Sequence, residues 1–319
     1  HLEKGDLVAS VNEFSSRQTR FYQKYNGLAL NHQTMLKTFL ESQDFSQIKA
    51  VENPVVKQSL LDAASDFYAY EFALSDDKTL YNSKKYALLS YQSTLPIVKL
   101  TEQPTQIAPP DQSTKPLMVS VGPVVGELSQ NTGLQFRFRS AYFDSLNLNY
   151  GKPKFATLSM FDLSLLQRSD KIKVKHLDLV KVESIQPSMT GLDADKDSTW
   201  FFNVGYEAND FVKGAFIKLG KGFSYPLTQD LVGVAMLNVK ASTSNERGAV
   251  MPQLKLISNP SQSFSYRAQL EYSQGLNSNY NRFISEVEIG FLREREREVR
   301  FLIKNDKHLS AGLSYQWYL

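Results

Sequence analysis

The sequence predicts a mainly β protein: an antiparallel up-and-down transmembrane β-barrel of about 12 strands, preceded by a small α-helical domain. Three observations carry this prediction. The spacing of apolar residues changes from three and four to two near residue 116. Many of the alternating stretches that follow run for ten or more residues. The chain ends on "HLSAGLSYQWYL", which alternates and carries bulky aromatic residues.

The composition of the chain excludes several classes of function. The 319 residues carry a formal net charge of +3, so no nucleic-acid partner is expected. Cysteine is absent, which excludes disulfides, thiolate nucleophiles and cysteine metal sites within these residues. No run of 18 apolar residues occurs, and "HLEKGDLVAS" lacks the apolar stretch of a signal peptide. We expect a removed signal or a piece of a longer precursor, and a β-barrel as the membrane form that remains possible.

Residues 1–97 have helical spacing and are expected to form a helical periplasmic connector domain. In "TMLKTFLESQ" the apolar residues recur at offsets of three and four. Asn53 is a favourable N-cap, and Pro54 follows at the first helical position of a second helix. A third helix is expected in "KTLYNSKKYALLSYQSTL", with Leu88 and Leu89 facing inward.

A Pro-rich linker, residues 98–116, is expected next. The stretch "LPIVKLTEQPTQIAPPDQSTKP" contains five prolines among Thr, Gln and Ser, which favours an extended segment or a strap along another surface.

Residues 117–319 are expected to form an outer-membrane β-barrel, because the period is two throughout. In "LQFRFRSAY", Phe136 and Phe138 share one face while Arg137 and Arg139 share the other. Strands are expected near 117–127, 131–143, 155–167, 171–183, 198–209, 211–223, 231–242, 249–258, 263–275, 281–293, 297–305 and 307–319.

One expected strand changes phase within itself. In "HLDLVKVESI", Leu177 and Leu179 share a phase that Val180 and Val182 do not. A β-bulge in this strand would explain the change.

The apolar faces of these strands could meet each other in a sandwich, point inward in a soluble barrel, or face lipid. Strand length favours lipid, because about 9–11 tilted residues span a bilayer. Aromatic residues also recur near strand ends, as in the girdles of membrane barrels. Closure is then required, because no sheet edge finds hydrogen-bond partners in hydrocarbon, so the first strand should pair with the last.

The final strand matches the assembly signal that outer-membrane barrels share. Gly312 is followed by aromatic residues at alternate positions, Tyr315 and Trp317. Leu319 stands where an aromatic residue is usual. The other interpretation is an ordinary closing strand of a soluble sheet.

Several segments resemble one family in particular, the proteins that carry an Lnb-type periplasmic domain. The segments "LQFRFRSAYFDSL", "KIKVKHLDLVKVESIQP" and "STWFFNVGYE" are similar to its C-terminal outer-membrane barrel, and "LDAASDFYAYEFAL" is similar to its connector. Phe143 stands where that family usually has His, and Thr199 precedes Trp200. The resemblance implies that a thiol-dependent hydrolase or acyltransferase-like domain precedes the connector in the family, and no such domain is contained in this chain.

The polar faces of the strands are expected to line the lumen. Arg and Glu rows should pair across the interior and give a plugged or tightly gated lumen. The expected charged network consists of Arg137, Arg139, Arg267, Glu271, Glu286, Glu288, Arg300 and Lys304.

Catalytic motifs are lacking: no HExxH, GxSxG, Walker A or GxGxxG pattern occurs, and no metal or cofactor is expected. His176 is the one candidate catalytic residue, with Ser159 or Ser164 as its partner in a lipid-modifying enzyme. "REREREVR" (293–300) predicts a self-neutralising hairpin turn at the membrane edge, or alternatively a docking patch for lipid headgroups.

Three functions are compatible with these features. The first is a non-enzymatic outer-membrane anchor for a periplasmic module, with the N-terminal domain in the periplasm. The second is a small-solute pore, and the third is a lipid-modifying enzyme. The expected partners are the lipid bilayer with its lipopolysaccharide, the barrel assembly machinery, and possible contact with a periplasmic catalytic domain or protein. If both chain ends lie in the periplasm, the long connection 184–199 lies there too.

Overall fold

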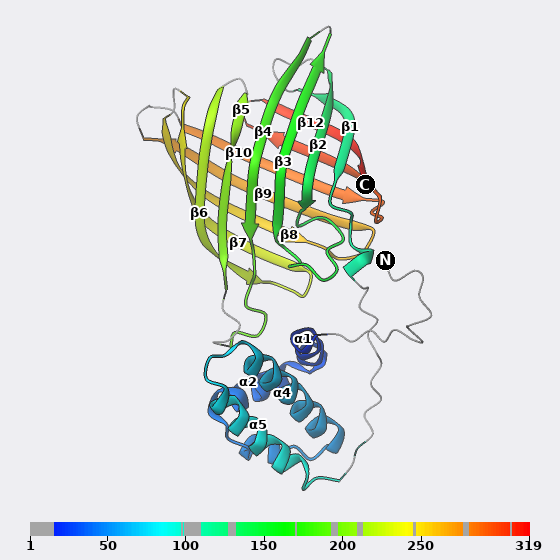
Figure 1. The fold of residues 1–319 in the computed structure, drawn as a ribbon, viewed down its shortest axis with the longest axis vertical. Helices are drawn as coiled ribbons and strands as arrows, with labels where there is room; N and C mark the ends of the chain where they lie inside the picture. The colour runs from blue at the N-terminus through cyan, green and yellow to red at the C-terminus, as the bar shows by residue number, and fades with distance from the viewer. Residues whose placement is uncertain are drawn as a thin grey trace, which may run out of the picture. The chain divides into compact units, whose positions relative to one another are not determined.

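The computed structural model in Figure 1 contains two units, each formed by two segments of the chain. The helical unit comprises His1–Ile107 and Thr190–Asp195, and the barrel unit comprises Ala108–Met189 and Lys196–Leu319. Most of the predicted Pro-rich linker, residues 98–116, lies outside the described residues. The structure describes residues 16–96, 98, 110–126, 132–169, 171–192, 197–208, 213–244, 247–276, 281–306 and 308–319.

The described part of the helical unit contains five α-helices. The predicted N-cap is confirmed, because the Asn53 side chain accepts hydrogen bonds from the backbone N–H groups of Val55 and Val56. The helices are α1 (Arg17–Gly27), α2 (Leu30–Ser42), α3 (Ser46–Ala50), α4 (Pro54–Leu74) and α5 (Lys78–Gln92). None of the described helices is long and apolar enough to cross a membrane.

The helices bury one apolar core and one carboxylate. Leu36, Leu60 and Leu88 are fully buried. Leu89, predicted to face inward, is 45% exposed, because it lies about 100° further round the helix than Leu88. Asp66 on α4 is buried and lies within 3.0 Å of the side-chain nitrogens of three basic residues, all on α1.

A residue that follows the barrel strand β4 (Lys171–Ser184) completes the core of the helical unit. Leu192 is only 4% exposed and packs in the same cluster as Leu36 and Leu60. The chain therefore contributes to the helical unit twice, once before the barrel and once between two of its strands.

Substitution Leu192→Ala is expected to destabilise the helical unit by about 2–3 kcal/mol, because it leaves a cavity in a closed core. Thermal unfolding followed by helical circular dichroism would measure this. Leu74→Ala is the matched control, because Leu74 is 65% exposed at the end of α4. Equal effects of the two substitutions would contradict a core role for Leu192.

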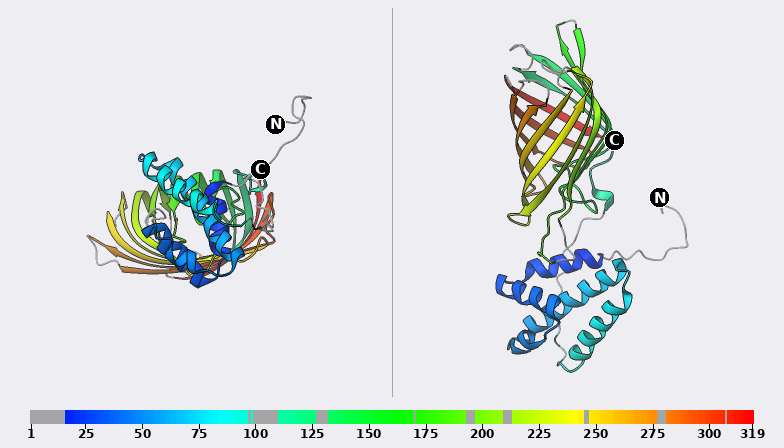
Figure 2. Two further views of the ribbon diagram at one scale, coloured as in Figure 1. Left: turned by 90° about the horizontal axis from the view of Figure 1, so that it is seen from below. Right: turned by 90° about the vertical axis from the view of Figure 1, so that its left-hand side faces the viewer.

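The barrel unit is a closed antiparallel sheet of twelve strands, which confirms the predicted fold class and the pairing of the first strand with the last (Figures 1 and 2). Each strand pairs with its neighbours in sequence, and a short 3₁₀ helix, η1 (Pro110–Gln112), precedes the first. The strands are β1 (Met118–Val125), β2 (Gly133–Phe143), β3 (Thr157–Arg168), β4 (Lys171–Ser184), β5 (Thr199–Ala208), β6 (Lys213–Pro226), β7 (Leu231–Ser242), β8 (Gly248–Ser258), β9 (Phe264–Gly275), β10 (Asn281–Phe291), β11 (Arg297–Asn305) and β12 (Leu309–Tyr318).

Strands β1 and β12 approach each other closely where they close the barrel. Met118 pairs with Tyr318, and Val121 pairs with Tyr315. At Gly122 a Cβ atom would lie 1.8 Å from the carbonyl oxygen of Leu313, so only glycine fits this position.

Register shifts occur in the pairings among β2, β3, β4 and β5. The predicted bulge in β4 is confirmed, since its pairing with β5 shifts between Asp178 and Val180. Further shifts follow Ser164 on β3 and Arg139 on β2. The shift after Asp178 turns Lys181 and Glu183 to the inward side, which strict alternation from Asp178 would turn outward.

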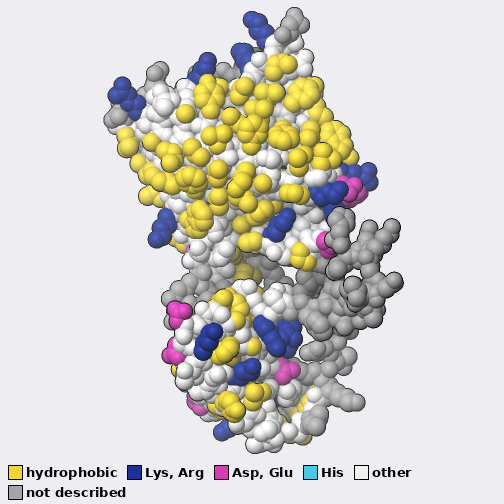
Figure 3. Space-filling view, viewed as in Figure 1, with side chains coloured by type: hydrophobic (Ala, Val, Ile, Leu, Met, Phe, Trp, Pro, Cys, Tyr) yellow, Lys and Arg dark blue, Asp and Glu magenta, His cyan; other side chains and the backbone are white. Residues whose placement is uncertain are grey.

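The outer wall of the barrel is apolar. Figure 3 shows hydrophobic side chains covering the visible face of the barrel as a broad belt. Large apolar side chains that are more than a third exposed occur on every strand, among them Val119, Phe136, Met160, Leu179, Trp200, Leu219, Leu237, Leu254, Leu270, Phe283, Ile303 and Trp317.

The connections differ at the two ends of the barrel. We call the end at which β1 begins and β12 ends the near end. Because the strands alternate in direction, the long connections 144–156 and 185–198 lie at the near end, together with both ends of the barrel unit. The second of them was predicted from the sequence, as 184–199. The connections at the far end are short.

Candidate functional site

The lumen of the barrel is filled by ion pairs, and these bring most of the predicted charged residues together. Arg267 pairs with Glu288 and lies 3.8 Å from Glu286. Both carboxylate oxygens of Asp162 accept hydrogen bonds from Arg137, at 2.7 and 2.6 Å. The ε-nitrogen of Arg139 lies 2.8 Å from the same carboxylate.

Two pairs reach across the lumen between strands that are not neighbours. Lys218 on β6 donates a 2.7 Å hydrogen bond to Glu271 on β9. Lys255 on β8 pairs with Glu183 on β4, and both side chains are at most 5% exposed. Lysine and glutamate side chains therefore occupy the space that an open channel would need.

Arg300 is the central residue of this interior and one of its largest fully buried side chains. Its guanidinium donates to both carboxylate oxygens of Asp144, at 2.5 and 2.9 Å, and to both of Glu298, at 2.8 and 3.2 Å. A fifth contact, 3.1 Å long, reaches Glu288. Two bidentate pairs of this kind hold a guanidinium in one orientation.

The connection between β2 and β3, residues 144–156, folds into the near end of the lumen, and we call it the inner loop. Its first residues, Asp144 to Asn147, are at most 4% exposed. The amide of Asn147 donates a 2.9 Å hydrogen bond to the Tyr318 hydroxyl on β12.

The inner loop also reaches the opposite wall. The backbone carbonyl of Ser145 accepts a 2.8 Å hydrogen bond from Asn259, which follows β8. The carbonyl of Leu146 accepts a 3.1 Å hydrogen bond from Ser265 on β9. A loop that starts at β2 and is hydrogen-bonded at β9 and β12 crosses the whole lumen.

Apolar side chains seal the near end around this loop. Leu146 and Phe155 from the inner loop, with exposures of 0% and 4%, form a buried cluster inside the barrel. The other members come from β5, β7 and β8 and from the residue that follows β4: Ile185, Phe201, Val232, Val234, Met236 and Ile257.

A small cavity lies beside the ion pairs in the lumen. A cavity of about 60 Å³ lies between β1, β2, β10, β11 and β12, which is room for a few water molecules. Its lining includes Ser120, Gln135, Glu288 and Arg300. Lys304 also lines it, and pairs with Asp306 at 4.0 Å rather than with the predicted Glu rows.

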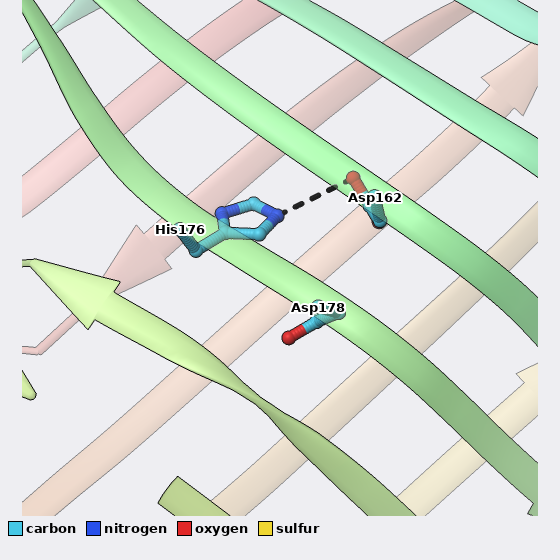
Figure 4. Close-up of side chains that lie close together, drawn as sticks. All are labelled: Asp162, His176 and Asp178. Atoms are coloured by element: carbon cyan, nitrogen blue, oxygen red, sulfur yellow. Dashed lines mark ion pairs between the residues drawn. The ribbon is translucent and has the colours of Figure 1, made fainter. Parts of the chain in front are cut away.

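His176 lies beside two carboxylates, as Figure 4 shows. Its Nε2 is 3.5 Å from Asp162, and one ligand atom from each of Asp162, His176 and Asp178 lies within 4.8 Å of the others. Both oxygens of Asp162 are already engaged by two arginines, whose positive charges disfavour a metal ion there.

Neither predicted serine partner of His176 is within hydrogen-bond distance among the described residues. Ser164 lies opposite His176 in the pairing of β3 and β4, but its hydroxyl accepts a 2.8 Å hydrogen bond from Gln135. Ser159 lies opposite Lys181. The histidine is thus paired with a carboxylate inside the barrel, and not with a nucleophile on the lipid-facing wall.

Two further sequence motifs reach the barrel surface, although "REREREVR" also contains the buried Arg293, Glu298 and Arg300. In "REREREVR", Arg297 pairs with Glu294 and Glu296 pairs with Lys115, so part of the turn neutralises itself. Tyr315 and Trp317 project outward with ring centroids 4.5 Å apart, beside Gly312 on the closing strand. Their part in assembly remains a prediction.

Sequence reasoning missed several members of the interior. Asp162 was detectable as the lone acid in the apolar strand "TLSMFDLSLLQR". Glu298 lies in "REREREVR", and the alternating charges of that segment predicted only a hairpin turn. Asp144 had no periodic context, because it lies in a loop.

A closed twelve-strand barrel with an apolar outer wall and an ion-paired interior has the architecture of a transmembrane β-barrel. Residues 108–318 match the family described as "Domain of unknown function (DUF7840)". The chain therefore belongs to the DUF7840 family. This match does not test the predicted relation to proteins that carry an Lnb-type domain, which stays a prediction.

Several solved barrels are similar to the chain. A KdgM porin is 8% identical, with 63% of this chain and 99% of that chain covered and a TM-score of 0.40. The COG4313 outer membrane channel from Pseudomonas putida F1 is 10% identical, with 67% and 100% covered and a TM-score of 0.42. The Acinetobacter baumannii outer membrane protein Omp33 is 10% identical, with 65% and 99% covered and a TM-score of 0.37. No curated protein matches significantly. The barrel assignment rests on the strand pairings of this chain and not on these similarities.

Proposed function

We propose that this protein is a closed outer-membrane barrel that anchors a periplasmic module, rather than an open pore. The observation that carries the proposal is the inner loop, which crosses the lumen and is hydrogen-bonded to the opposite wall. These contacts support a barrel in which the inner loop closes the near end to water. Its apolar outer wall suits a bilayer.

The near end is the end that would hold the periplasmic module. Both chain ends of the barrel unit and its long connections lie there, and the helical unit takes residues from before β1 and from the connection after β4. Two chain connections restrict a domain more than one flexible tether would. By resemblance, the module is a thiol-dependent hydrolase or acyltransferase-like domain supplied in the same protein or by a separate one.

Planar bilayer recording of the purified protein tests the proposal. We expect no stable single-channel steps at moderate voltage, because the loop and the cross-lumen ion pairs exclude a water path. Protein that has kept its fold, judged by β-sheet circular dichroism and heat-modifiable gel mobility, is the required control. Long-lived open channels would instead favour a small-solute pore.

A further inference from the structure

One positive charge lies on the apolar outer wall without a partner. Lys221 on β6 shares its outward phase with Leu219 (48% exposed) and Phe223 (67% exposed). It has no ion-pair partner among the described residues. Lys213, at the far end of β6, also faces outward. It is the only other outward-facing charged residue on β5, β6, β7 and β8.

The position of Lys221 is costly in a membrane. It lies five residues before Pro226, the near-end terminus of β6, which is roughly 12 Å along the barrel axis for a tilted strand. A lysine on the lipid face of a barrel costs up to about 2–4 kcal/mol at the bilayer midplane and little near the interface. A bound anion would reduce that cost.

Beside Lys221 the outer wall carries a shallow, open groove. A groove of about 490 Å³ runs over β5, β6 and β7, and its outward lining is Trp200, Phe202, Leu219, Lys221, Leu237 and Val239. Five of these six side chains are apolar, so the groove fits a hydrocarbon chain beside a cation.

We infer that this groove binds one membrane glycerophospholipid, with its phosphate on the Lys221 ammonium and an acyl chain along Trp200, Leu219 and Leu237. The inference rests on the proposed membrane location. A free phosphate ion would leave the apolar lining unused. A second copy of this chain would offer no counter-charge, because no outward-facing strand residue that the structure describes is acidic.

Native mass spectrometry of the whole chain, released from non-ionic detergent, tests the site with added phosphatidylglycerol as the probe. We expect Lys221→Gln to weaken retention of one lipid about tenfold or more, because a charge-assisted hydrogen bond is lost. Lys221→Arg should keep the lipid, and so should the matched control Lys213→Gln.

Two outcomes would overturn the inference. One is equal retention by Lys221→Gln and the unchanged protein, and the other is displacement of the lipid by millimolar inorganic phosphate, which would indicate a plain anion site. Membrane fractionation is measured separately. Protein found in the membrane but with lipid retention independent of Lys221 would overturn this inference and leave the proposed location intact.

Discussion

Replacing residues 145–153 of the inner loop with a short Gly-Ser linker is expected to convert the closed barrel into one that conducts ions. The replacement removes the carbonyl groups of Ser145 and Leu146 that are bound at the opposite wall, and it removes Leu146 from the apolar seal. It keeps Asp144, so the ion pair with Arg300 remains. β2 and β3 are adjacent, so a linker of hairpin length can join them.

Single-channel current in planar bilayers is the measurement, with the unchanged protein recorded alongside. The matched control replaces only the tip of the same loop, residues 151–154, whose Gly151, Pro153 and Lys154 are exposed. That control should remain closed. If the shortened barrel folds and stays silent, the cross-lumen lysine–glutamate pairs close the lumen without the loop, and its assigned role is wrong.

The strands of this barrel could be predicted from the sequence because the lipid outside and the lumen inside differ strongly in polarity. Side chains that face lipid are mostly apolar, and those that face the lumen are free to be charged, so alternation persists over most of each strand. The bounds of β7 and β11 are those that the sequence pattern predicts, 231–242 and 297–305. The bulge in β4 was also readable, since a phase change has no other simple cause.

The ionic partners in the lumen were predictable only where they follow from strand register. Arg267 and Glu288 lie directly opposite each other in the β9–β10 hairpin, so their pairing follows from the alternation. The partner of Arg300 is Asp144, 156 positions earlier in the chain and in a loop with no period. A local sequence pattern cannot predict such a contact, because only the closed barrel brings the two residues together.

The same limit explains the division of the helical unit. Leu192 is an isolated leucine in "SIQPSMTGLDADKDST", and a leucine in a polar loop has no predicted partner. Its burial in a helical core depends on where two separate segments of the chain meet. The domain organisation could therefore be predicted for the first helical segment and not for the second.

Substitution Arg300→Ala is expected to lower the free energy of unfolding of the barrel by about 3–5 kcal/mol, because it leaves buried carboxylates without their cation. Among the described residues, Glu298 loses its one basic partner, and Asp144 keeps Arg139, at 3.7 Å, as its one basic partner. Urea unfolding in detergent micelles, followed by tryptophan fluorescence, would measure the loss. Arg297→Ala is the matched control on the same strand, where an exposed pair with Glu294 should be worth at most about 1 kcal/mol.

A double substitution separates the cost of an unpaired charge from a general loss of packing. Arg300→Met together with Asp144→Asn removes one guanidinium and one carboxylate, and keeps much of the side-chain volume. We expect the double variant to be less destabilised than the sum of the two single variants, since Arg300→Met alone leaves the buried Asp144 carboxylate without its main cation, and Asp144→Asn removes that charge. Additive effects would mean that Arg300 acts by filling space, and the electrostatic account of the closed lumen would then be wrong.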